Sequence, residues 1–358
     1  MNGRRDRMEN QEKKHKRRIR YSGAYPKNYK EKYKELNPEK YADTVSRVIE
    51  KGSTPAGMHI SICVKEILDF LQIKPGQTGL DATLGYGGHT QEMLKCLQSK
   101  GHLYALDVDP IESAKTKERL EKLGYGEDIL TIRLQNFADI DLVARDAGKF
   151  DFILADLGVS SMQIDNPDRG FSYKTEGPLD LRMNPQKGIS AAQRLKNIFR
   201  EELMGMLQEN SDEPYAKEIS QEIVSRLKKG GHIETTGELR QAIEDALSFL
   251  PAPERKEAVK KSCQRTFQAL RIDVNSEFEA LYALMEKLPQ VLAPNGRAAI
   301  LTFHSGEDRI VKKSFKQFYK EGIYSEISDE VIRPSAEECA RNSRARSTKM
   351  RWAIRAAD

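Results

Sequence analysis

The spacing of apolar residues changes regularly along the chain after its first 54 residues. The first predicted helix contains Val64, Ile67, Leu68 and Leu71 and ends at Pro75-Gly76. Short apolar runs typical of strands follow at 78–82, 102–107, 129–134 and 150–156, and helical patterns separate them at 89–98, 111–123 and 139–147. Strands that alternate with helices indicate a parallel, doubly wound sheet, whose ligand site lies beyond the carboxyl ends of the strands.

This alternation stops between residues 166 and 274. That stretch has helical patterns at 191–209, 214–229 and 237–248 but no convincing strand. The alternation then resumes with a helix at 276–292, a strand at 297–303, a helix at 307–319 and a strand at 349–354. We therefore predict an α/β domain formed by 55–165 and 275–358, with a helical domain at 166–274 inserted into it.

The turn after the first predicted strand is rich in glycine. Asp81 ends that strand, and Gly85-Tyr86-Gly87-Gly88-His89 leads into a helical pattern. Glycine lets the backbone approach a ligand closely, and the start of a helix presents unpaired N–H groups to it. The second strand ends in Asp107, where a carboxylate can bind the two hydroxyls of a ribose. Together these features predict a nucleoside cofactor.

The glycine turn departs from the dinucleotide fingerprint. In G-x-G-x-x-G three glycines surround a pyrophosphate, but here His89 and Thr90 follow Gly88 and the third glycine is missing. Asp81 would repel a pyrophosphate and attract a cation, such as the sulfonium and amino group of S-adenosylmethionine. The local chemistry favours this methyl donor. A dinucleotide oxidoreductase and a turn that binds nothing remain the alternatives.

Length and composition narrow the class of protein. A chain of 358 residues is expected to form about two domains. Its four cysteines are scattered without metal-ligand spacing, which favours reduced thiols, no metal site and a cytoplasmic location. The charged N-terminus has no apolar signal core, and no run of about 18 apolar residues occurs, so neither secretion nor a membrane span is expected.

Positive charge is concentrated at the N-terminus, in a basic, Tyr/Lys-rich extension predicted over 1–54. Residues 1–20 have nine Lys/Arg and three acids, whereas the other 338 residues have a net charge of −1. Such an arm binds polyanions by counterion release, or is only solubilising. Tyr21, Tyr25, Tyr29 and Tyr33 then recur every fourth residue among lysines. These tyrosines either stack on single-stranded RNA or pack on the main domain.

Five further blocks lie in a fixed order along the chain: 151–163 with Asp156, 169–183, 266–275, 302–312 and 342–347. With the glycine turn, they resemble the RsmH (MraW) family over about residues 55–355. That family comprises bacterial methyltransferases that act on N4 of a cytidine in the decoding region of small-subunit ribosomal RNA. The resemblance implies a class I S-adenosylmethionine-dependent methyltransferase fold with a helical insertion, and ribosomal RNA or the small ribosomal subunit as partner.

The resemblance also assigns cofactor contacts, to Gly87, Gly88, His89, Asp107, Phe137, Asp156 and Gln163. Asp107 would bind the ribose and Phe137 would lie against the adenine. Asp81 is added on the basis of charge alone, near the methionine amino group.

Three blocks depart from the family pattern. Ser211–Tyr215 stands where members have Tyr-Gly-Glu-Glu, Lys261–Arg265 where they have His-Pro-Ala, and Gly306 where they have leucine. These changes fall on the expected substrate side. A different RNA target, or a cofactor-binding assembly factor without chemistry, therefore remains an alternative.

Three residues are candidates for catalysis. Asp156 would accept the protons of the target amino group, or would only contact the cofactor, because Leu157-Gly158-Val159 follows it instead of Pro-Pro-Tyr. His304 and Asp308 are the other polar candidates near a strand end, although His304 would equally cap the next helix.

Three arginines are candidates for RNA contact: Arg182, Arg344 and Arg346. Arg182 would otherwise pair with Asp180, and the other two would be solvated surface charges. Phe171 would stack on the target base or belong to the core. Because a paired base cannot present its amino group, the target nucleotide must be single-stranded or flipped out.

Overall fold

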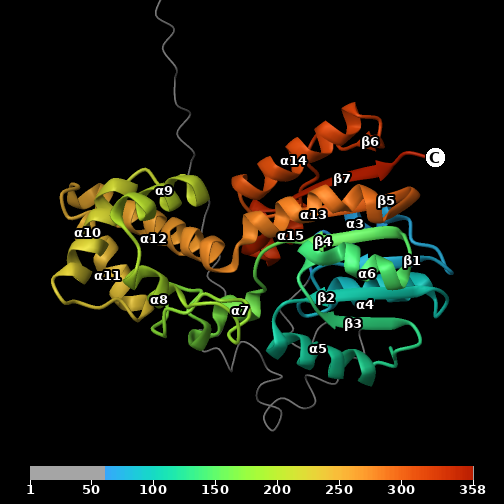
Figure 1. The fold of residues 1–358 in the computed structure, drawn as a ribbon, viewed down its shortest axis with the longest axis horizontal. Coiled ribbons are helices and arrows are strands. Elements are labelled where there is room, and N and C mark those ends of the chain that lie inside the picture. The colour runs from blue at the N-terminus through green and yellow to red at the C-terminus, as the bar shows by residue number, and fades with distance from the viewer. Residues whose placement is uncertain (1–60, 358) are drawn as a thin grey trace, which may run out of the picture.

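One mostly parallel sheet organises the protein. The structure, a computed structural model, describes residues 61–357. The strands are β1 (Thr78–Asp81), β2 (His102–Asp107), β3 (Leu130–Leu134), β4 (Phe150–Asp156), β5 (Leu292–Thr302), β6 (Tyr324–Ile327) and β7 (Lys349–Arg355). They lie in the order β3-β2-β1-β4-β5-β7-β6, with β7 antiparallel to both of its neighbours (Figure 1). This confirms the predicted α/β methyltransferase-type fold.

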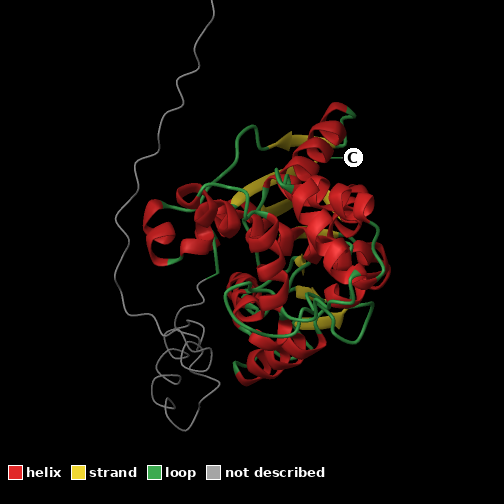
Figure 2. Ribbon diagram, turned by 90° about the vertical axis from the view of Figure 1, so that its left-hand side faces the viewer, coloured by secondary structure: helices red, strands yellow, loops and turns green. Residues whose placement is uncertain are grey.

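Helices cover both faces of the sheet, as a doubly wound fold requires. Core residues of α6 (Ile140–Ala147), α13 (Glu277–Val291) and α14 (Ser305–Lys320) pack together on one face. Those of α3 (Val64–Leu71), α4 (Gly88–Leu97) and α5 (Pro110–Lys122) belong to a second cluster on the other face. Figure 2, turned by 90°, shows strands flanked by these helices.

A separate helical lobe lies beside the sheet (Figure 1). It contains α8 (Ala191–Lys196), α9 (Arg200–Ser211), α10 (Ala216–Lys228), α11 (Thr236–Ala246) and α12 (Ala252–Asn275). These helices share a hydrophobic core of their own, with members from Phe171 to Leu270. At the end of α12 the chain turns through Ser276, which has a φ of 49°, directly into α13. That turn places the last residues of α12 beside the sheet.

The predicted elements differ from the structure in particular places. The pattern expected over 191–209 is two helices, because α8 ends at Lys196 and Phe199 precedes α9 in extended conformation. The edge strand β6 escapes sequence analysis because only its first residue, Tyr324, is buried. The short helices α7 (Ser161–Asp165) and α15 (Ala336–Arg341) have too few residues for a helical period to show.

No helix within residues 61–357 is long and apolar enough to cross a membrane. The predicted basic arm and its tyrosine repeat lie outside the described residues.

Candidate active site

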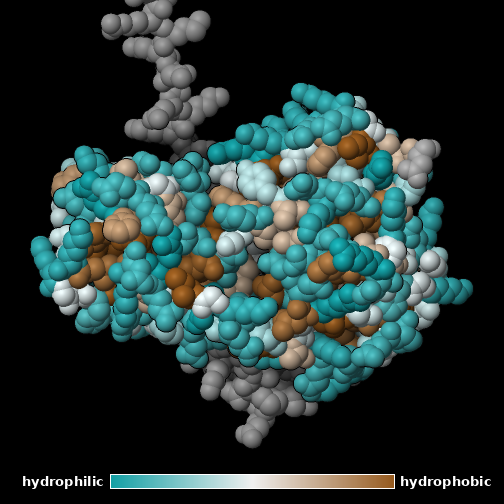
Figure 3. All heavy atoms as spheres, in the orientation of Figure 1, coloured by the Kyte–Doolittle hydropathy of each residue, from teal (hydrophilic) through white to brown (hydrophobic). Residues whose placement is uncertain are grey.

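A pocket of about 300 Å³ lies between the carboxyl edge of the sheet and the helical lobe. The sheet side is formed by residues at or after the ends of β1 to β4: Thr83, Val108, Leu134–Phe137, Leu157 and Gly158. The other side is formed by Met183, Asn184, Lys187 and Gly188, by the turn from Val274 to Leu281, and by Glu307. Figure 3 shows hydrophobic residues gathered between the two lobes. The pocket is therefore at the place where doubly wound folds bind ligands.

Asp81 is buried at the end of β1 and organises the following loop. Its Oδ1 accepts the Thr83 N–H at 3.1 Å, and its Oδ2 accepts the Thr90 hydroxyl at 2.6 Å. The Thr83 hydroxyl oxygen in turn accepts the backbone N–H of Asp156 at 2.7 Å. Burial raises the pKa of Asp81. Asp81 thus ties the glycine loop to the end of β4, and Thr83, not Asp81 itself, reaches the pocket.

The glycine loop requires glycine at Gly87. This residue has a φ of 72° and precedes the first residue of α4, so a side chain there would strain the backbone. A Cβ atom would also lie 2.8 Å from Cγ2 of Thr116, on α5. The Thr116 hydroxyl donates to the Gly85 carbonyl at 2.7 Å. The loop is consequently held between β1, β2 and α5.

Asp107 holds the loops on both sides of the ribose position predicted above. Its Oδ2 accepts the Gly85 N–H and its Oδ1 accepts the Asp109 N–H, each at 2.8 Å. Burial raises the pKa of Asp107 to about 6. Each carboxylate oxygen keeps a second lone pair for a ligand hydroxyl. Phe137, the first residue of a short 3-10 helix after β3, lines the same pocket.

Asp156 and His89 face each other at the end of β4. The Asp156 Oδ2 lies 3.6 Å from the His89 Nδ1, while the His89 Nε2 bonds the Ile62 carbonyl at 2.9 Å. The Asp156 Oδ1 is buried without a hydrogen-bond partner in residues 61–357. Burial raises the pKa of Asp156 to about 6. A buried carboxylate oxygen that lacks a donor is expected to accept a hydrogen bond from a ligand group.

Gln163 belongs to a buried network that includes Asp109 and Arg169. Gln163 Nε2 and Arg169 Nη1 both donate to the Asp109 Oδ2, at 2.8 and 2.7 Å. The Asp109 Oδ1 accepts two N–H groups at the start of α5. The partners of Gln163 are thus protein groups, and its assignment to the cofactor stays a prediction.

The network continues into a strap that covers one side of the pocket. The Arg169 Nη2 donates to the carbonyls of Arg182 and Met183 at 3.0 and 2.8 Å. Asn275, at the end of α12, accepts the Met183 N–H at 2.7 Å and donates to the Leu181 carbonyl at 2.7 Å. Residues 181–188, which we call the strap, are therefore fastened to both lobes.

His304 caps α14. Its Nδ1 accepts the Glu307 N–H at 3.4 Å, and its Nε2 lies 3.2 Å from the Glu307 carboxylate. The Nε2 is buried and makes no hydrogen bond within residues 61–357, so the Nδ1 contact alone supports the capping alternative, and a role of His304 in the site stays a prediction. Glu307 itself is buried and lines the pocket.

Asp308 follows the pocket-lining Glu307 but is not part of the pocket lining. Its carboxylate accepts the Arg351 Nε at 2.6 Å and the Lys349 ammonium at 2.8 Å. These cations hold the pKa of Asp308 below its usual value, although burial opposes them. The structure does not bring Asp308 to the pocket, because it fastens α14 to β7.

Two of the three predicted RNA-contact arginines are paired. Arg182 forms a two-bond ion pair with Asp180, at 2.8 and 2.7 Å, as the alternative interpretation held. Arg344 bonds both oxygens of Asp165, at 3.2 and 2.7 Å. Arg346 is exposed and has no ion pair within the described chain. Phe171 is part of the helical-lobe core.

Two departures from the family pattern meet in the helical lobe. Glu213 is buried, and its Oε1 accepts the Ser262 hydroxyl at 2.8 Å and the Tyr215 N–H at 3.0 Å. The two blocks thus contact each other between α9 and α12, although Ser211–Tyr215 and Lys261–Arg265 lie apart in sequence.

Gly306 is the third departure, and Phe278 occupies the space beside it. A Cβ atom on Gly306 would lie 2.7 Å from the Phe278 Cζ and 3.1 Å from the His304 Nδ1. We expect Gly306→Leu to lower the free energy of unfolding by about 1–3 kcal/mol, since the core here is filled. Adding Phe278→Leu should recover most of this loss in urea unfolding. Equal losses in the single and double variants would contradict the proposed contact.

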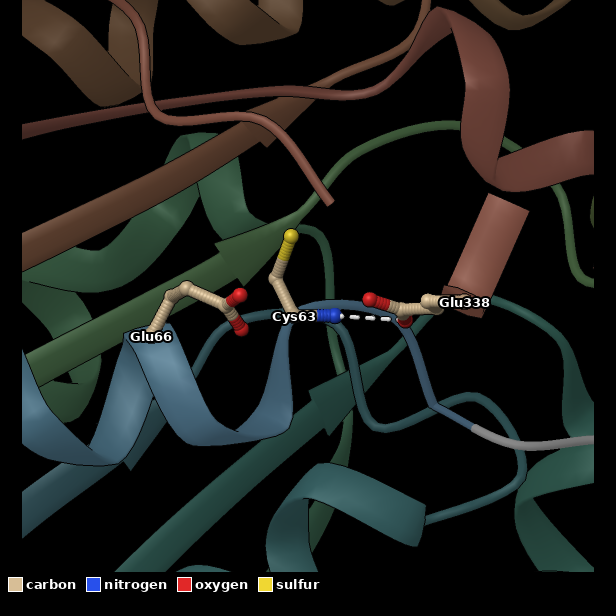
Figure 4. Close-up of side chains that lie close together, drawn as sticks. All are labelled: Cys63, Glu66 and Glu338. Atoms are coloured by element: carbon tan, nitrogen blue, oxygen red, sulfur yellow. Dashed lines mark hydrogen bonds between the residues drawn. The ribbon is translucent and has the colours of Figure 1, made fainter. Parts of the chain in front are cut away.

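Cys63, Glu66 and Glu338 form the group that most resembles a metal site within residues 61–357. Figure 4 shows Glu338 directed at the backbone of Cys63, whose N–H donates to it at 2.9 Å. Burial, and then Glu338, raises the pKa of the Cys63 thiol, so the thiol stays protonated at neutral pH and is a poor ligand. The group is best explained as a contact that docks α15 on the start of α3.

Sequence reasoning did not single out several pocket residues: Thr83, Asn136, Asn184, Lys187, Ser276, Glu277 and Glu307. Glu307 lies inside a recognised block, and Asn184 and Ser276 directly follow two others. The recognised blocks therefore pointed to the neighbourhood of these residues. A single sequence does not show which side of a helix or loop faces the pocket.

Comparisons with known proteins show the family to which the chain belongs. The model of the MraW methylase family matches residues 56–356. Ribosomal RNA small subunit methyltransferase H 1 of Lachnoclostridium phytofermentans is 72% identical over 348 residues, which cover 97% of this chain and 95% of that protein. The protein of the same name from Agathobacter rectalis is 69% identical, over 97% of this chain and 99% of that protein.

Among solved structures, a SAM-dependent O-methyltransferase from Thermotoga maritima is 10% identical with a TM-score of 0.40, over 88% of this chain and 72% of that chain. The match of the family model over most of the chain is decisive. This chain belongs to the MraW methylase family.

Proposed function

We propose that this protein transfers a methyl group from S-adenosylmethionine to N4 of a cytidine in small-subunit ribosomal RNA. Family membership and the relatives named as small-subunit ribosomal RNA methyltransferases support the reaction class and the substrate. The single structural observation that carries the proposal is the buried, unpartnered Asp156 Oδ1 at the end of β4, beside the pocket.

The residues around the pocket fit this cofactor. Asp81, Asp107 and Asp156 stand at three adjacent strand ends, and burial raises the pKa of each. A cationic ligand would compensate this cluster of acids, and the orphaned oxygen would gain a donor. Asp107 would hold the ribose hydroxyls and Phe137 would lie against the adenine. When bound, the sulfonium supplies an already activated methyl group, so the protein mainly aligns donor and acceptor.

The acceptor presents the harder problem, because the N4 lone pair of cytosine is delocalised into the ring. A carboxylate that accepts a hydrogen bond from the amino group localises this lone pair and can then take a proton. Asp156 directly precedes the pocket-lining Leu157 and has an oxygen to spare, and His89 lies 3.6 Å from its other oxygen. We assign this role to Asp156. If Asp156 contacted only the cofactor, Asp156→Asn would still transfer methyl groups.

The helical lobe, predicted over 166–274, is proposed as the substrate side. The strap and the start of α13 form the side of the pocket opposite the strand ends. An unstacked base would enter on this side. A substrate of this kind places the protein in the cytoplasm.

Turnover of labelled S-adenosylmethionine on small-subunit RNA, followed by mass mapping of the product, tests the proposal. Label should appear in one N4-methylcytidine. Methylation of a different nucleotide would refute the target. Cofactor binding without turnover on either naked RNA or isolated subunits would instead favour an assembly factor without chemistry.

The raised pKa of Asp156 predicts a pH-dependent effect of Asp156→Asn. An acid whose pKa rises from 3.8 to about 6 on folding stabilises the fold fully below pH 4, and this contribution is lost as pH rises through 6. The cofactor-free variant should therefore gain on the order of 2 kcal/mol in unfolding free energy relative to wild type between pH 4 and 7. Its methyl transfer should fall at least a hundredfold.

Asp308→Asn is the matched control, because the pKa of Asp308 is lowered on folding. The Asp308 carboxylate stabilises the fold at neutral pH, and this contribution is lost as the pH falls. The difference in unfolding free energy between wild type and Asp308→Asn should therefore grow as the pH rises. Urea unfolding at several pH values measures both. If the difference in unfolding free energy between Asp156→Asn and wild type does not vary with pH, folding does not raise the pKa of Asp156.

A further inference from the structure

The outward face of α14 has a row of cations that the proposed chemistry does not use. Arg309, Lys313, Lys316 and Lys320 are exposed and recur at intervals of three and four residues, so they lie on one face of the helix. Lys312 flanks the row and is also exposed. We call these five residues the α14 stripe. Figure 3 shows a hydrophilic surface at the top of the molecule, where Figure 1 places α14.

Acids lie near this row only at its two ends: Asp212 is close to Arg309, and Glu321, just after α14, lies beside the stripe lysines and accepts the Gln317 Nε2 at 3.1 Å. None of its four lysines forms an ion pair with any residue of 61–357, and Arg309 has only a 3.9 Å approach to the exposed Asp212. The acids of α14 itself, Glu307 and Asp308, are buried. The surface lysines of α5 show the contrast, since Lys115, Lys117 and Lys122 each pair with a glutamate of the same helix.

The first turn of α14 reaches the pocket, and the stripe begins two residues after Glu307 on the opposite face of the helix. Glu307, in the first turn of α14, lines the pocket, and Arg309 approaches Asp212 at the end of α9. From Arg309 to Lys320 the row extends by about 16 Å. At about 3.4 Å for each nucleotide of a stacked strand, this length spans about five phosphates. Tyr319, 48% exposed and three residues after Lys316, adds an aromatic side chain on which a base can stack.

We propose that the α14 stripe binds the sugar-phosphate backbone of the RNA strand that leads out of the pocket. This inference rests on the proposed function, because it takes the substrate to be RNA. Unpaired cations attract any polyanion. Because α14 begins at the pocket and has an exposed tyrosine near its end, a nucleic-acid strand that passes around the start of the helix is favoured over an acidic protein surface.

The test compares two triple variants with the same change in charge. One is Lys313→Gln, Lys316→Gln and Lys320→Gln in the stripe, and the control is Lys115→Gln, Lys117→Gln and Lys122→Gln on α5. Glutamine keeps helix propensity close to that of lysine. For each full-length protein, binding to a small-subunit RNA fragment is measured by fluorescence anisotropy from 50 to 300 mM salt. KM and kcat for methyl transfer, cofactor affinity and thermal unfolding are measured alongside.

The stripe variant should bind RNA about tenfold more weakly at low salt, and the slope of log affinity against log salt should fall by about 2, for three lost contacts on a single strand. KM for RNA should rise while kcat and cofactor affinity stay unchanged. The α5 variant should match wild type. An unchanged slope in the stripe variant, or equal changes in both variants, would overturn the proposal. If wild type binds RNA but shows no turnover, the proposed function fails while the binding comparison still decides the stripe.

Discussion

Asp107→Ala should weaken binding of S-adenosylmethionine at least a hundredfold and reduce methyl transfer accordingly. The variant loses the carboxylate that would accept both ribose hydroxyls, and charge-assisted hydrogen bonds of this kind contribute about 1.5–3 kcal/mol each. It also leaves the N–H groups of Gly85 and Asp109 without their acceptor. Because these N–H groups hold the glycine loop and the start of α5, the free energy of unfolding should fall by about 2 kcal/mol.

Asp151→Ala separates the two effects. The Asp151 Oδ2 also accepts a backbone N–H, that of Thr78 at 2.8 Å, but at the opposite end of β1 and β4. This control should lose stability and keep its cofactor affinity. Calorimetric titration with the demethylated product measures affinity, and urea unfolding measures stability. Wild-type affinity in Asp107→Ala would exclude Asp107 as the ribose ligand.

The strand ends are the part of the site that sequence alone could locate. A buried parallel strand is a short apolar run, so β1, β2 and β4 are visible in the sequence, and each ends in an aspartate. Parallel strands of one sheet bring these ends to one edge. Asp81, Asp107 and Asp156 could therefore be placed together before any contact was known.

The partners of these residues could not be predicted in the same way. Asp109 and Arg169 are 60 residues apart, and Asp308 and Arg351 are 43 apart. Nothing in the local pattern pairs such residues, because the pairing depends on how a loop or helix is rotated after folding. His304 and Asp308 were adjacent polar candidates in sequence, but one caps α14 and the other bonds β7.

The resemblance to the family also did not show which groups each residue contacts. It brought Gln163 forward as a cofactor contact, whereas the structure shows its amide bonded to Asp109 and to its own helix start. A residue can be characteristic of a family because it holds the site together. The network of Gln163, Arg169 and Asp109 joins the start of α5 to the strap, and this connection was not apparent from any single block.

Arg169→Met should be the most destabilising of the proposed single substitutions. Arg169 and Asp109 are 6% and 0% exposed, and their ion pair is 2.7 Å long. Removing one partner of a buried pair leaves an uncompensated charge, which costs about 3–5 kcal/mol. The variant also frees the carbonyls of Arg182 and Met183, so the strap loses one of its two attachments. KM for RNA should therefore rise even where the protein remains folded.

Two further variants identify the cause of that loss. Asp109→Asn combined with Arg169→Met should recover part of the stability, because asparagine still caps α5 and no buried charge remains. Arg344→Met breaks a partly exposed pair, with Asp165, and should cost only about 1 kcal/mol. Urea unfolding of all three gives the comparison. If Arg344→Met costs as much as Arg169→Met, burial is not what makes the Arg169 network important, and the strap must then be held chiefly by Asn275.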